Sequence, residues 1–439
     1  MSGRVRLLAA VAMATSACMG PIEDEARPDS DPVQATSAAV SCGSGGAANP
    51  FGTHARAYAG GILPSHRTRA QLDATAKSYY NTWKSKYLKK GCGSTSGHAR
   101  YYVDSGMSDA RTVSEAHGYG MLLTAYFAGH DAAAQTEFDG LYYYFKAHQS
   151  ETTPYLMAWS QAKDAACTNN QGPDSATDGD LDVAYGLLLA DKQWGSSGAI
   201  NYKAEAKKVI AAIKSGESTG DAYVNLGDWT GHTGPQGDST RSSDFMPGHF
   251  ASFAAASGDG AWTSILNRSY TTMQQVAAGS APNTGLLPDF IKSPRSNPKP
   301  VAPNFLEGAN DGKYSYNACR DPLRIAVHFL TSGDTRSKNL VQKMNTFIKS
   351  KTGGNPDNIR AGYSLSGSPV SGSDYFTNAF AAPFAVGAMV DASNQTWLNS
   401  SYDAVVAQTP EGYYEDTIKM LALLVMSGNW WTPEAAPCN

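Results

Sequence analysis

Apolar residues recur at three- and four-residue intervals in several stretches of the chain after about residue 50. Such spacing is typical of an α-helix that turns one face to the core and the other to water. In the first stretch the shared face carries Leu72, Ala76, Tyr79, Tyr80, Trp83 and Tyr87. The segments 206–213 and 340–348 repeat the pattern, so we expect amphipathic helices there as well.

Four other segments are apolar almost all the way round a helix. They are YGMLLTAYFAG (119–129), VAYGLLLA (183–190), FAAPFAVGAMV (380–390) and IKMLALLVM (418–426). A helix without a polar face must be covered on every side. The amphipathic and the apolar helices tend to alternate along the chain with short connections, and this order predicts two concentric helical layers.

Strand-like alternation of polar and apolar residues is scarce in the chain. About 390 residues divided among helix-plus-loop units of about 30 give roughly a dozen helices, so residues 49–439 are expected to form one all-α domain. An α-solenoid also places helices in series, but the sequence has no fixed repeat period with matching residues.

The first 18 residues have the features of an export signal. Arg4 and Arg6 precede an apolar run, 7–14, which is too short to span a bilayer, and small residues follow it before Cys18. The position of Cys18 is typical of bacterial lipoprotein processing, so we expect a lipid anchor there, with ordinary signal cleavage nearby as the alternative. Either outcome predicts a secreted or cell-envelope protein.

Composition limits which other segments, partners and bound groups we expect. Residues 19–48 are rich in acidic residues, Pro, Ser, Ala and Gly, and we expect them to form a flexible linker. A net charge of -4 with only 17% charged residues leaves no basic field for nucleic acid. Five cysteines follow Cys18, so at least one stays unpaired or pairs outside this set. None of them has metal-ligand spacing, and we expect a monomer without a metal or other cofactor.

Three acids occupy alternate positions, Asp178, Asp180 and Asp182, where one of the apolar helices begins. A calcium loop that starts at Asp178 would need Gly at the sixth place and Glu at the twelfth, but Val183 and Leu189 stand there. Helix capping accounts for some of these acids, above all Asp182. Capping does not account for three like charges at the start of an apolar helix.

A second apolar helix begins in the same way. Glu115 falls in the first turn of the segment TVSEAHGYGMLLTAYFAG (112–129). If both helices belong to the inner layer, Glu115 and Asp178 lie at the same end of neighbouring helices. A carboxyl group shielded by aromatic neighbours can have a raised pKa and act as a general acid. The two residues are therefore candidates for a catalytic site.

The stretch ATDGDLDVAYGLLLADKQW (176–194) resembles the signature of glycoside hydrolase family 8. It departs from the family pattern at Val183, where Ile or Met is usual, and at Gly186, where Ser or Ala is usual. VSEAHGYGM (113–121) resembles the general-acid segment of that family, in which Gln often stands at His117. Further similarity follows in matching order in GLLPDF (285–290), YSYNACRDPLRIA (314–326) and YYEDTIKMLALLVMSGNWW (413–431).

The resemblance implies an (α/α)6 barrel, in which six outer helices surround six inner ones, and an inverting, endo-acting enzyme. Inversion requires an acid that protonates the leaving oxygen and a base that activates water. By motif position, Glu115 matches the family's general acid, and Asp178 matches the aspartate that holds the sugar beside the cleaved bond. For Asp180 we expect a structural role, and helix capping is the favoured one.

The general base is where the sequence departs from many family members. They carry Asp at the position of Asn317, and an amide cannot take a proton from water at neutral pH. One branch of the family is similar to this chain, with Asn at that place and a glutamate base in the preceding loop. The resemblance thus implies Glu307 as the base, with Asp311 second. The alternative is that Glu307 is an ordinary solvated loop acid.

Aromatic side chains stack on sugar faces, so rings near the motifs are candidates for substrate binding. By motif position these are Trp159, Trp229, Tyr316 and Tyr413, although a buried ring is more often part of the core. Arg320 is expected to pair with a carboxylate of the site and hold it ionised.

The favoured prediction is a secreted or surface-anchored glycosidase that cuts β-1,4-linked glucan, either mixed-linkage glucan or cellulose. A chitosanase or xylanase of the same family and a polysaccharide-binding protein without activity are the alternatives. Asn317 supports the inactive protein. The intact Glu115 and Asp178 segments oppose it, because a mere binder has no need for an acid with a tuned pKa.

Overall fold

The computed structural model describes residues 46–434 except 55, 221–222 and 232. The expected signal segment, Cys18 and most of the expected linker lie outside the described residues. The packed chain begins before residue 49, because Ala47 is buried and the amide of Ala48 donates a hydrogen bond to the carbonyl of Gln193. In the described part of the chain, no helix is both long enough and apolar enough to cross a bilayer.

Six amphipathic helices form the outer layer of the described domain. They are α1 (Arg69–Tyr87), α3 (Ala134–Ala147), α5 (Tyr202–Gly216), α8 (Ala261–Gly279), α10 (Thr335–Lys351) and α12 (Gln395–Ala407). Only six of the seventeen residues of α10 are buried, which is typical of a helix with a wet face. Several of these helices have capped starts: Thr68 and Gln71 form a capping box at α1, and Asn201 caps α5.

Six apolar helices form the inner layer. They are α2 (Ser114–Tyr126), α4 (Thr177–Trp194), α7 (Pro247–Ser257), α9 (Asp321–Ser332), α11 (Asn378–Ala388) and α13 (Tyr413–Met426). All eleven residues of α11 are buried, and in α2 every residue except Glu115 is buried. A single turn, α6 (Gly234–Gly237), lies outside the two layers of the ring. The alternation expected from the sequence is confirmed, and the fold is an (α/α)6 barrel.

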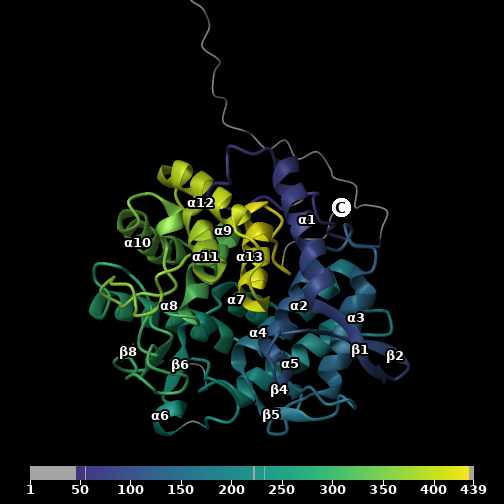
Figure 1. Ribbon diagram of the computed structural model, residues 1–439. Coiled ribbons are helices and arrows are strands. Elements are labelled where there is room, and N and C mark those ends of the chain that lie inside the picture. The colour runs from purple at the N-terminus through teal and green to yellow at the C-terminus, as the bar shows by residue number, and fades with distance from the viewer. Residues whose placement is uncertain (1–45, 55, 221–222, 232, 435–439) are drawn as a thin grey trace, which may run out of the picture. The chain divides into compact units, whose positions relative to one another are not determined.

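The first and last helices close the ring. In Figure 1, α1 runs beside α13 although more than 300 residues separate them in sequence. The indole nitrogen of Trp83 donates to Thr417 Oγ1 at 2.9 Å, and the Tyr87 hydroxyl donates to Asp416 Oδ2 at 2.6 Å. Lys86 pairs with the same carboxylate. These contacts between buried and half-buried polar groups join the first helix of the ring to the last.

Three small antiparallel sheets lie in the connections between helices. They are β1 (Leu88–Thr95) with β2 (His98–Val103), β3 (Ala110–Val113) with β4 (Ala158–Ala162) and β5 (Asn170–Ser175), and β6 (Ser239–Arg241) with β7 (Phe290–Lys292) and β8 (Lys299–Pro300). Strand β3 leads directly into α2, and β5 ends two residues before α4. The second sheet therefore aligns the first turns of two neighbouring inner helices.

A disulfide between Cys92 and Cys167 ties β1 to the connection between β4 and β5. Cys319 is a free, buried thiol, so the unpaired cysteine expected from the odd count is present among the described residues. Cys42 and Cys438 lie outside them.

Helices α2 and α4 cross at unusually short range because glycines stand at the crossing. A Cβ atom on Gly179 would lie 2.4 Å from Ser114 Oγ, and one on Gly118 would lie 2.7 Å from the Cβ of Asp182. The missing side chains let the two backbones approach. The crossing lies at the start of both helices, where Glu115 and Asp178 are found.

Candidate active site

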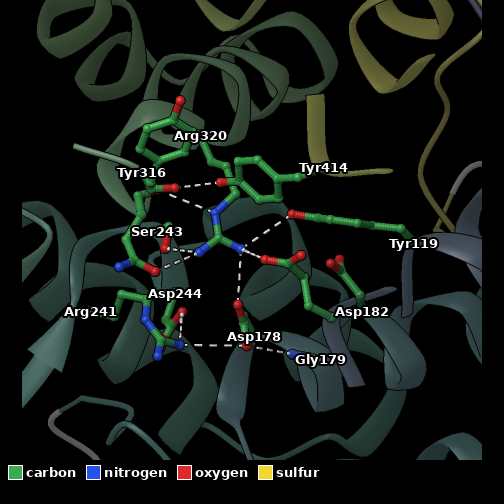
Figure 2. Close-up of polar contacts among 12 residues, drawn as sticks. Tyr119, Asp178, Gly179, Asp182, Arg241, Ser243, Asp244, Tyr316, Arg320 and Tyr414 are labelled. Atoms are coloured by element: carbon green, nitrogen blue, oxygen red, sulfur yellow. Dashed lines mark hydrogen bonds and ion pairs between the residues drawn. The ribbon is translucent and has the colours of Figure 1, made fainter. Parts of the chain in front are cut away.

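Glu115 and Asp178 share one partner, the guanidinium group of Arg320. Arg320 ends the 3-10 turn Ala318–Arg320, just before α9. Its Nη1 donates to Asp178 Oδ2 at 2.9 Å (Figure 2). The same nitrogen donates to Glu115 Oε2 at 2.7 Å. Its Nη2 donates to Ser243 Oγ and to the carbonyl oxygen of the Asn317 side chain. The structure thus brings together the two acids and the arginine that the sequence proposed, from three separate inner helices or the turns beside them.

Glu115 lies where a carboxyl group is difficult to ionise. Burial raises its pKa to about 7, and the charge of Asp178 adds to the effect. The charges of Arg320 and Arg241 and a hydrogen bond from the Tyr413 hydroxyl to Oε1 at 3.2 Å act in the opposite direction. The side chain is still 19% exposed, so a ligand can reach it. A carboxyl group of this kind can donate a proton near neutral pH.

Asp178 has the opposite tendency. Burial alone would raise its pKa, but the nearby Arg241 and Arg320 outweigh burial and hold the pKa below its ordinary value. Arg241 Nη1 lies 3.5 Å from Oδ1, and the amide of Gly179 donates to the same oxygen at 3.0 Å. The site therefore contains one carboxyl group that readily stays protonated beside one that stays ionised.

Glu307 reaches the same cluster from the loop between β8 and the turn at Ala318. The Asn317 carboxamide donates to its Oε2 at 2.7 Å, and Arg241 Nη2 lies 3.5 Å from its Oε1. Asn317 thus connects Glu307 to Arg320, and Arg241 connects it to Asp178. The Glu307 side chain is half exposed, so its carboxylate is open to water.

Asp311 has a different task in this loop. It is buried, and its carboxylate accepts hydrogen bonds from the backbone amides of Leu306, Glu307 and Gly308 at 2.7–3.1 Å. These contacts shape the turn that carries Glu307. Of the two candidate bases, the structure places Glu307 at the acid cluster and uses Asp311 to hold the turn.

Three of the four candidate binding rings are among the most exposed aromatic side chains of the described chain. Trp159 is 40% exposed, Trp229 39% and Tyr316 37%. Tyr316 donates to or accepts from Tyr375, another exposed ring, through their hydroxyls at 2.7 Å. Large aromatic rings that are exposed to this extent suit the flat faces of sugars.

Comparison with known proteins identifies the chain. The sequence pattern of glycosyl hydrolases family 8 matches residues 64–428. The chain belongs to this family. It is 48% identical to a beta-glucanase of Niallia circulans over 385 residues, which cover 87% of this chain and 91% of that one. It is 41% identical to an endoglucanase of Bacillus sp. strain KSM-330, over 86% of this chain and 80% of that one.

A solved structure of the apo form of a beta-1,3-1,4-glucanase from Paenibacillus sp. X4 is similar throughout. It superposes with a TM-score of 0.82 and 46% identity, and the match covers 88% of this chain and 99% of that one. The protein is therefore a family 8 glycoside hydrolase that acts on β-glycans in the endo manner, with the barrel fold that the motifs implied.

Three expectations about this site need correction. Asp180 does not cap α4, because its carboxyl group accepts the amide of Met157, outside the helix. Asp182 does not cap α4: it is fully buried and binds Arg324 at 2.5–2.9 Å and His249 at 2.8 Å, deep between α4, α7 and α9. Tyr413 is only 8% exposed and is packed edge-on against Tyr87, so it offers its hydroxyl to Glu115 rather than an open ring to a sugar.

Several residues of the cluster have no counterpart in the sequence analysis. Arg241, on β6, lies close to Asp178 and Asp244 (Figure 2). It also lies close to Glu307. Tyr414 donates its hydroxyl to the carbonyl of Tyr316 at 2.5 Å. The sequence did offer one signal for Arg241: it is a lone arginine in a segment, 239–247, that carries few charges. Among the described residues, no group of three or more His, Cys, Asp or Glu side chains is arranged to hold a metal ion.

Proposed function

We propose that this family 8 enzyme hydrolyses internal β-1,4 linkages of β-glucans, with mixed-linkage β-1,3-1,4-glucan as the preferred substrate, by an inverting mechanism. A solved structure and two sequence relatives support this choice of substrate. The solved relative at 46% identity is a beta-1,3-1,4-glucanase, and the relatives at 48% and 41% identity are a beta-glucanase and an endoglucanase.

Glu115 is the general acid in this proposal. Its pKa of about 7, raised mainly by burial, keeps a proton on the carboxyl group at mildly acidic pH. That proton passes to the glycosidic oxygen as the bond to the leaving sugar breaks. The Tyr413 hydroxyl, which donates to Oε1, then stabilises the carboxylate that remains.

Glu307 is the general base. Its carboxylate is exposed to water yet fixed in direction by Asn317 and Arg241. Asn317 itself cannot take a proton from water, but its amide nitrogen donates to Glu307 and its carbonyl oxygen accepts from Arg320. The observation that carries the proposal is this continuous contact from Glu115 through Arg320 and Asn317 to Glu307. An inverting pair must leave room for a water molecule between the two carboxyl groups, at roughly 6.5–9.5 Å in general.

Asp178 remains ionised between two guanidinium groups and supplies a fixed negative charge. The transition state of glycoside hydrolysis carries positive charge on the sugar ring, so a preorganised carboxylate at its side lowers the barrier. This role needs no proton transfer, and the lowered pKa of Asp178 agrees with it.

The first experiment separates an enzyme from a binder. Purified mature chain is assayed for reducing ends on barley β-glucan, carboxymethylcellulose, xylan and chitosan, beside its Glu115→Gln and Glu307→Gln variants. Both substitutions should lower kcat by at least about a thousandfold on the best substrate, while the affinity for that glycan changes little. Release of the α-anomer, followed by proton NMR during the first minutes, is the expected stereochemical result.

Each part of the proposal can fail separately. A β-anomeric first product contradicts inversion. Full activity of Glu307→Gln contradicts the base assignment. Faster turnover of xylan or chitosan than of barley β-glucan overturns the substrate, and no turnover of any of the four by the unaltered chain favours a polysaccharide-binding protein.

A further inference from the structure

A second pair of acids lies beneath the substrate-facing residues, outside the cluster of Glu115 and Asp178. Asp180, in the first turn of α4, and Glu217, directly after α5, are both fully buried. Their carboxyl groups lie within hydrogen-bonding reach of each other. Asp180 Oδ2 and Glu217 Oε2 have no other partner among the described residues.

Two buried carboxyl groups in contact hold at least one proton. Burial raises the pKa of Glu217 to about 8, and burial followed by the charge of Glu217 raises that of Asp180 well above its ordinary value. The other charged groups that act on the pair are Asp228 and Asp244, both acidic. In the described chain neither acid has an ion pair with a cation, so the shared proton is what joins them.

The pair is bonded to the residue that directly precedes β4, the strand that carries Trp159. Asp180 Oδ1 accepts the backbone amide of Met157 at 2.7 Å, two residues before Trp159. The indole of Trp159 lies against Gly172 of the neighbouring strand, where a Cβ atom would come within 2.0 Å of the indole nitrogen. The position of this ring therefore depends on how β4 and β5 are held against α4.

The same pair is bonded to the segment that carries Trp229. The hydroxyl of Ser175 donates to Glu217 Oε1 at 2.5 Å and accepts the amide of Asp228 at 3.0 Å. The amide of Ser175 in turn donates to Asp228 Oδ1 at 2.8 Å. Asp228 directly precedes Trp229. Through one serine, Glu217 is thus connected to the second exposed indole.

We propose that Asp180 and Glu217 form a positioning pair that holds the two indole rings, Trp159 and Trp229, at a fixed place relative to Asp178. Asp178 and Asp180 share one turn of α4, so the pair joins the reacting end of the site to both rings. The inference rests on the proposed function, because it takes the two rings to bind the glycan. Neither acid contacts the substrate.

The decisive variants are Glu217→Met and Glu217→Gln. Methionine fills the same space but removes both hydrogen bonds, so KM for barley β-glucan should rise about tenfold, as expected when two ring contacts are weakened, with kcat changed less than about threefold. Glutamine can still accept from Ser175 and donate to Asp180, and it should keep KM within about twofold of the unaltered enzyme. Ser175→Ala, a milder change, is the second test in case the methionine variant does not fold.

Ligand binding is measured separately from turnover in a Glu115→Gln background. Titration with a mixed-linkage β-glucan tetrasaccharide, followed by tryptophan fluorescence, should give a weaker Kd when Glu217→Met is added and an unchanged Kd when Glu217→Gln is added. Between pH 7 and 9, Kd should weaken with Glu217 present and stay level with Gln, because only Glu217 can lose the shared proton.

Two results overturn the inference. One is an unchanged KM and Kd in both Glu217→Met and Ser175→Ala. The other is a loss confined to kcat, which would make the pair part of the reacting centre. Trp159→Ala and Trp229→Ala distinguish this failure from that of the proposed function: if they raise KM while the Glu217 variants do not, the rings bind glycan but the pair does not position them. If the tryptophan variants leave KM unchanged, the binding role of the rings is wrong.

Discussion

Arg320 determines the charge state of the acids around it. It is buried, and its guanidinium group contacts Glu115, Asp178, Asn317, Ser243 and Tyr119. One cation between two carboxyl groups cannot stabilise both negative charges fully. Asp178 also forms an ion pair with Arg241 and accepts from the Gly179 amide, whereas Glu115 adds only the hydrogen bond from Tyr413 and the more distant charge of Arg241. The difference in neighbours separates the two pKa values and gives each acid its chemical role.

Substitution of Tyr413 by Phe tests this account of Glu115. The Tyr413 hydroxyl stabilises the ionised form, so its loss should raise the pKa of Glu115 above about 7. A lost hydrogen bond worth about 1 kcal/mol corresponds to a shift of roughly 0.7 unit. The alkaline limb of kcat/KM, measured from pH 5 to 9, should therefore move to higher pH by that amount.

Tyr414→Phe is the matched control, because the Tyr414 hydroxyl donates to the carbonyl of Tyr316 and not to Glu115. Its alkaline limb should stay in place. A limb that moves to lower pH in Tyr413→Phe would contradict the assignment of Glu115 as the group that must be protonated.

At the scale of residues, sequence reasoning found the groups that belong to long motifs. Glu115, Asp178 and Arg320 each lie next to an apolar helical run, which marks where the chain enters the inner layer. Arg241 and Asp244 were missed because they lie in a short strand and turn without helical periodicity. The contacts of Arg241 with Asp178 and Glu307 join segments more than 60 residues apart, and no local pattern records such a contact.

The element that matters most for the site is the crossing of α2 and α4. Its close approach depends on glycine at 118 and 179, since side chains there would meet the opposite helix at 2.4–2.9 Å. This approach brings the first turns of both helices, and therefore Glu115 and Asp178, to the same guanidinium group. Packing of two elements thus determines a distance between functional groups.

Gly179→Ala should move the two helices apart. The added Cβ would meet Ser114 Oγ at 2.4 Å, and overpacking of this kind costs about 1–3 kcal/mol. We expect a lower midpoint of guanidinium unfolding and a loss of kcat of about tenfold or more, because Glu115 and Asp178 no longer share Arg320 in the same geometry.

Gly248→Ala, on the inner helix α7, provides the comparison. A Cβ atom there meets nothing within 4 Å, so helix propensity should make this variant as stable as the unaltered chain or slightly more stable. Equal behaviour of the two alanine variants would show that the crossing tolerates a wider spacing.

Elements were predictable to different extents. The four apolar segments, which fall mainly within α2, α4, α11 and α13, could be assigned to the inner layer because a helix without a polar face has only one place in a barrel. The three small sheets were not expected, since their strands are only two to eight residues long and strand-like alternation is scarce in the sequence. Tyr413 was misjudged for a related reason: its place at a helix start was visible, but its burial depends on Tyr87 of a distant helix.

The molecule as a whole contains several buried acids whose pKa lies far above the ordinary value. Burial raises the pKa of Glu115, Asp244 and Asp289 to about 7 and that of Glu217 to about 8. Between about pH 4.5 and 8 the folded chain therefore binds more protons at these groups than the unfolded chain does. Their contribution to the free energy of unfolding is fully present below the unfolded pKa and is lost as the pH rises.

Stability should accordingly fall from pH 6.5 to pH 8. Below pH 6.5 the buried His117 and His328, whose pKa burial lowers to about 4, act in the opposite direction, because the unfolded chain binds protons there that the folded chain does not. Guanidinium unfolding at pH 6.5, 7.2 and 8 should therefore give successively lower midpoints. Glu217→Gln removes one of the titrating groups and should make the decline shallower. A midpoint that rises with pH over this range would contradict the burial of these acids in protonated form.

The closure of the ring by α1 and α13 has a consequence for biosynthesis. Glu115 is made 298 residues before Tyr413, the tyrosine that contacts it. A nascent chain therefore carries its acid long before α13 can close the barrel and complete the site. The same order makes the last helix a checkpoint, because a prematurely terminated chain lacks both the seam with α1 and the partner of its acid.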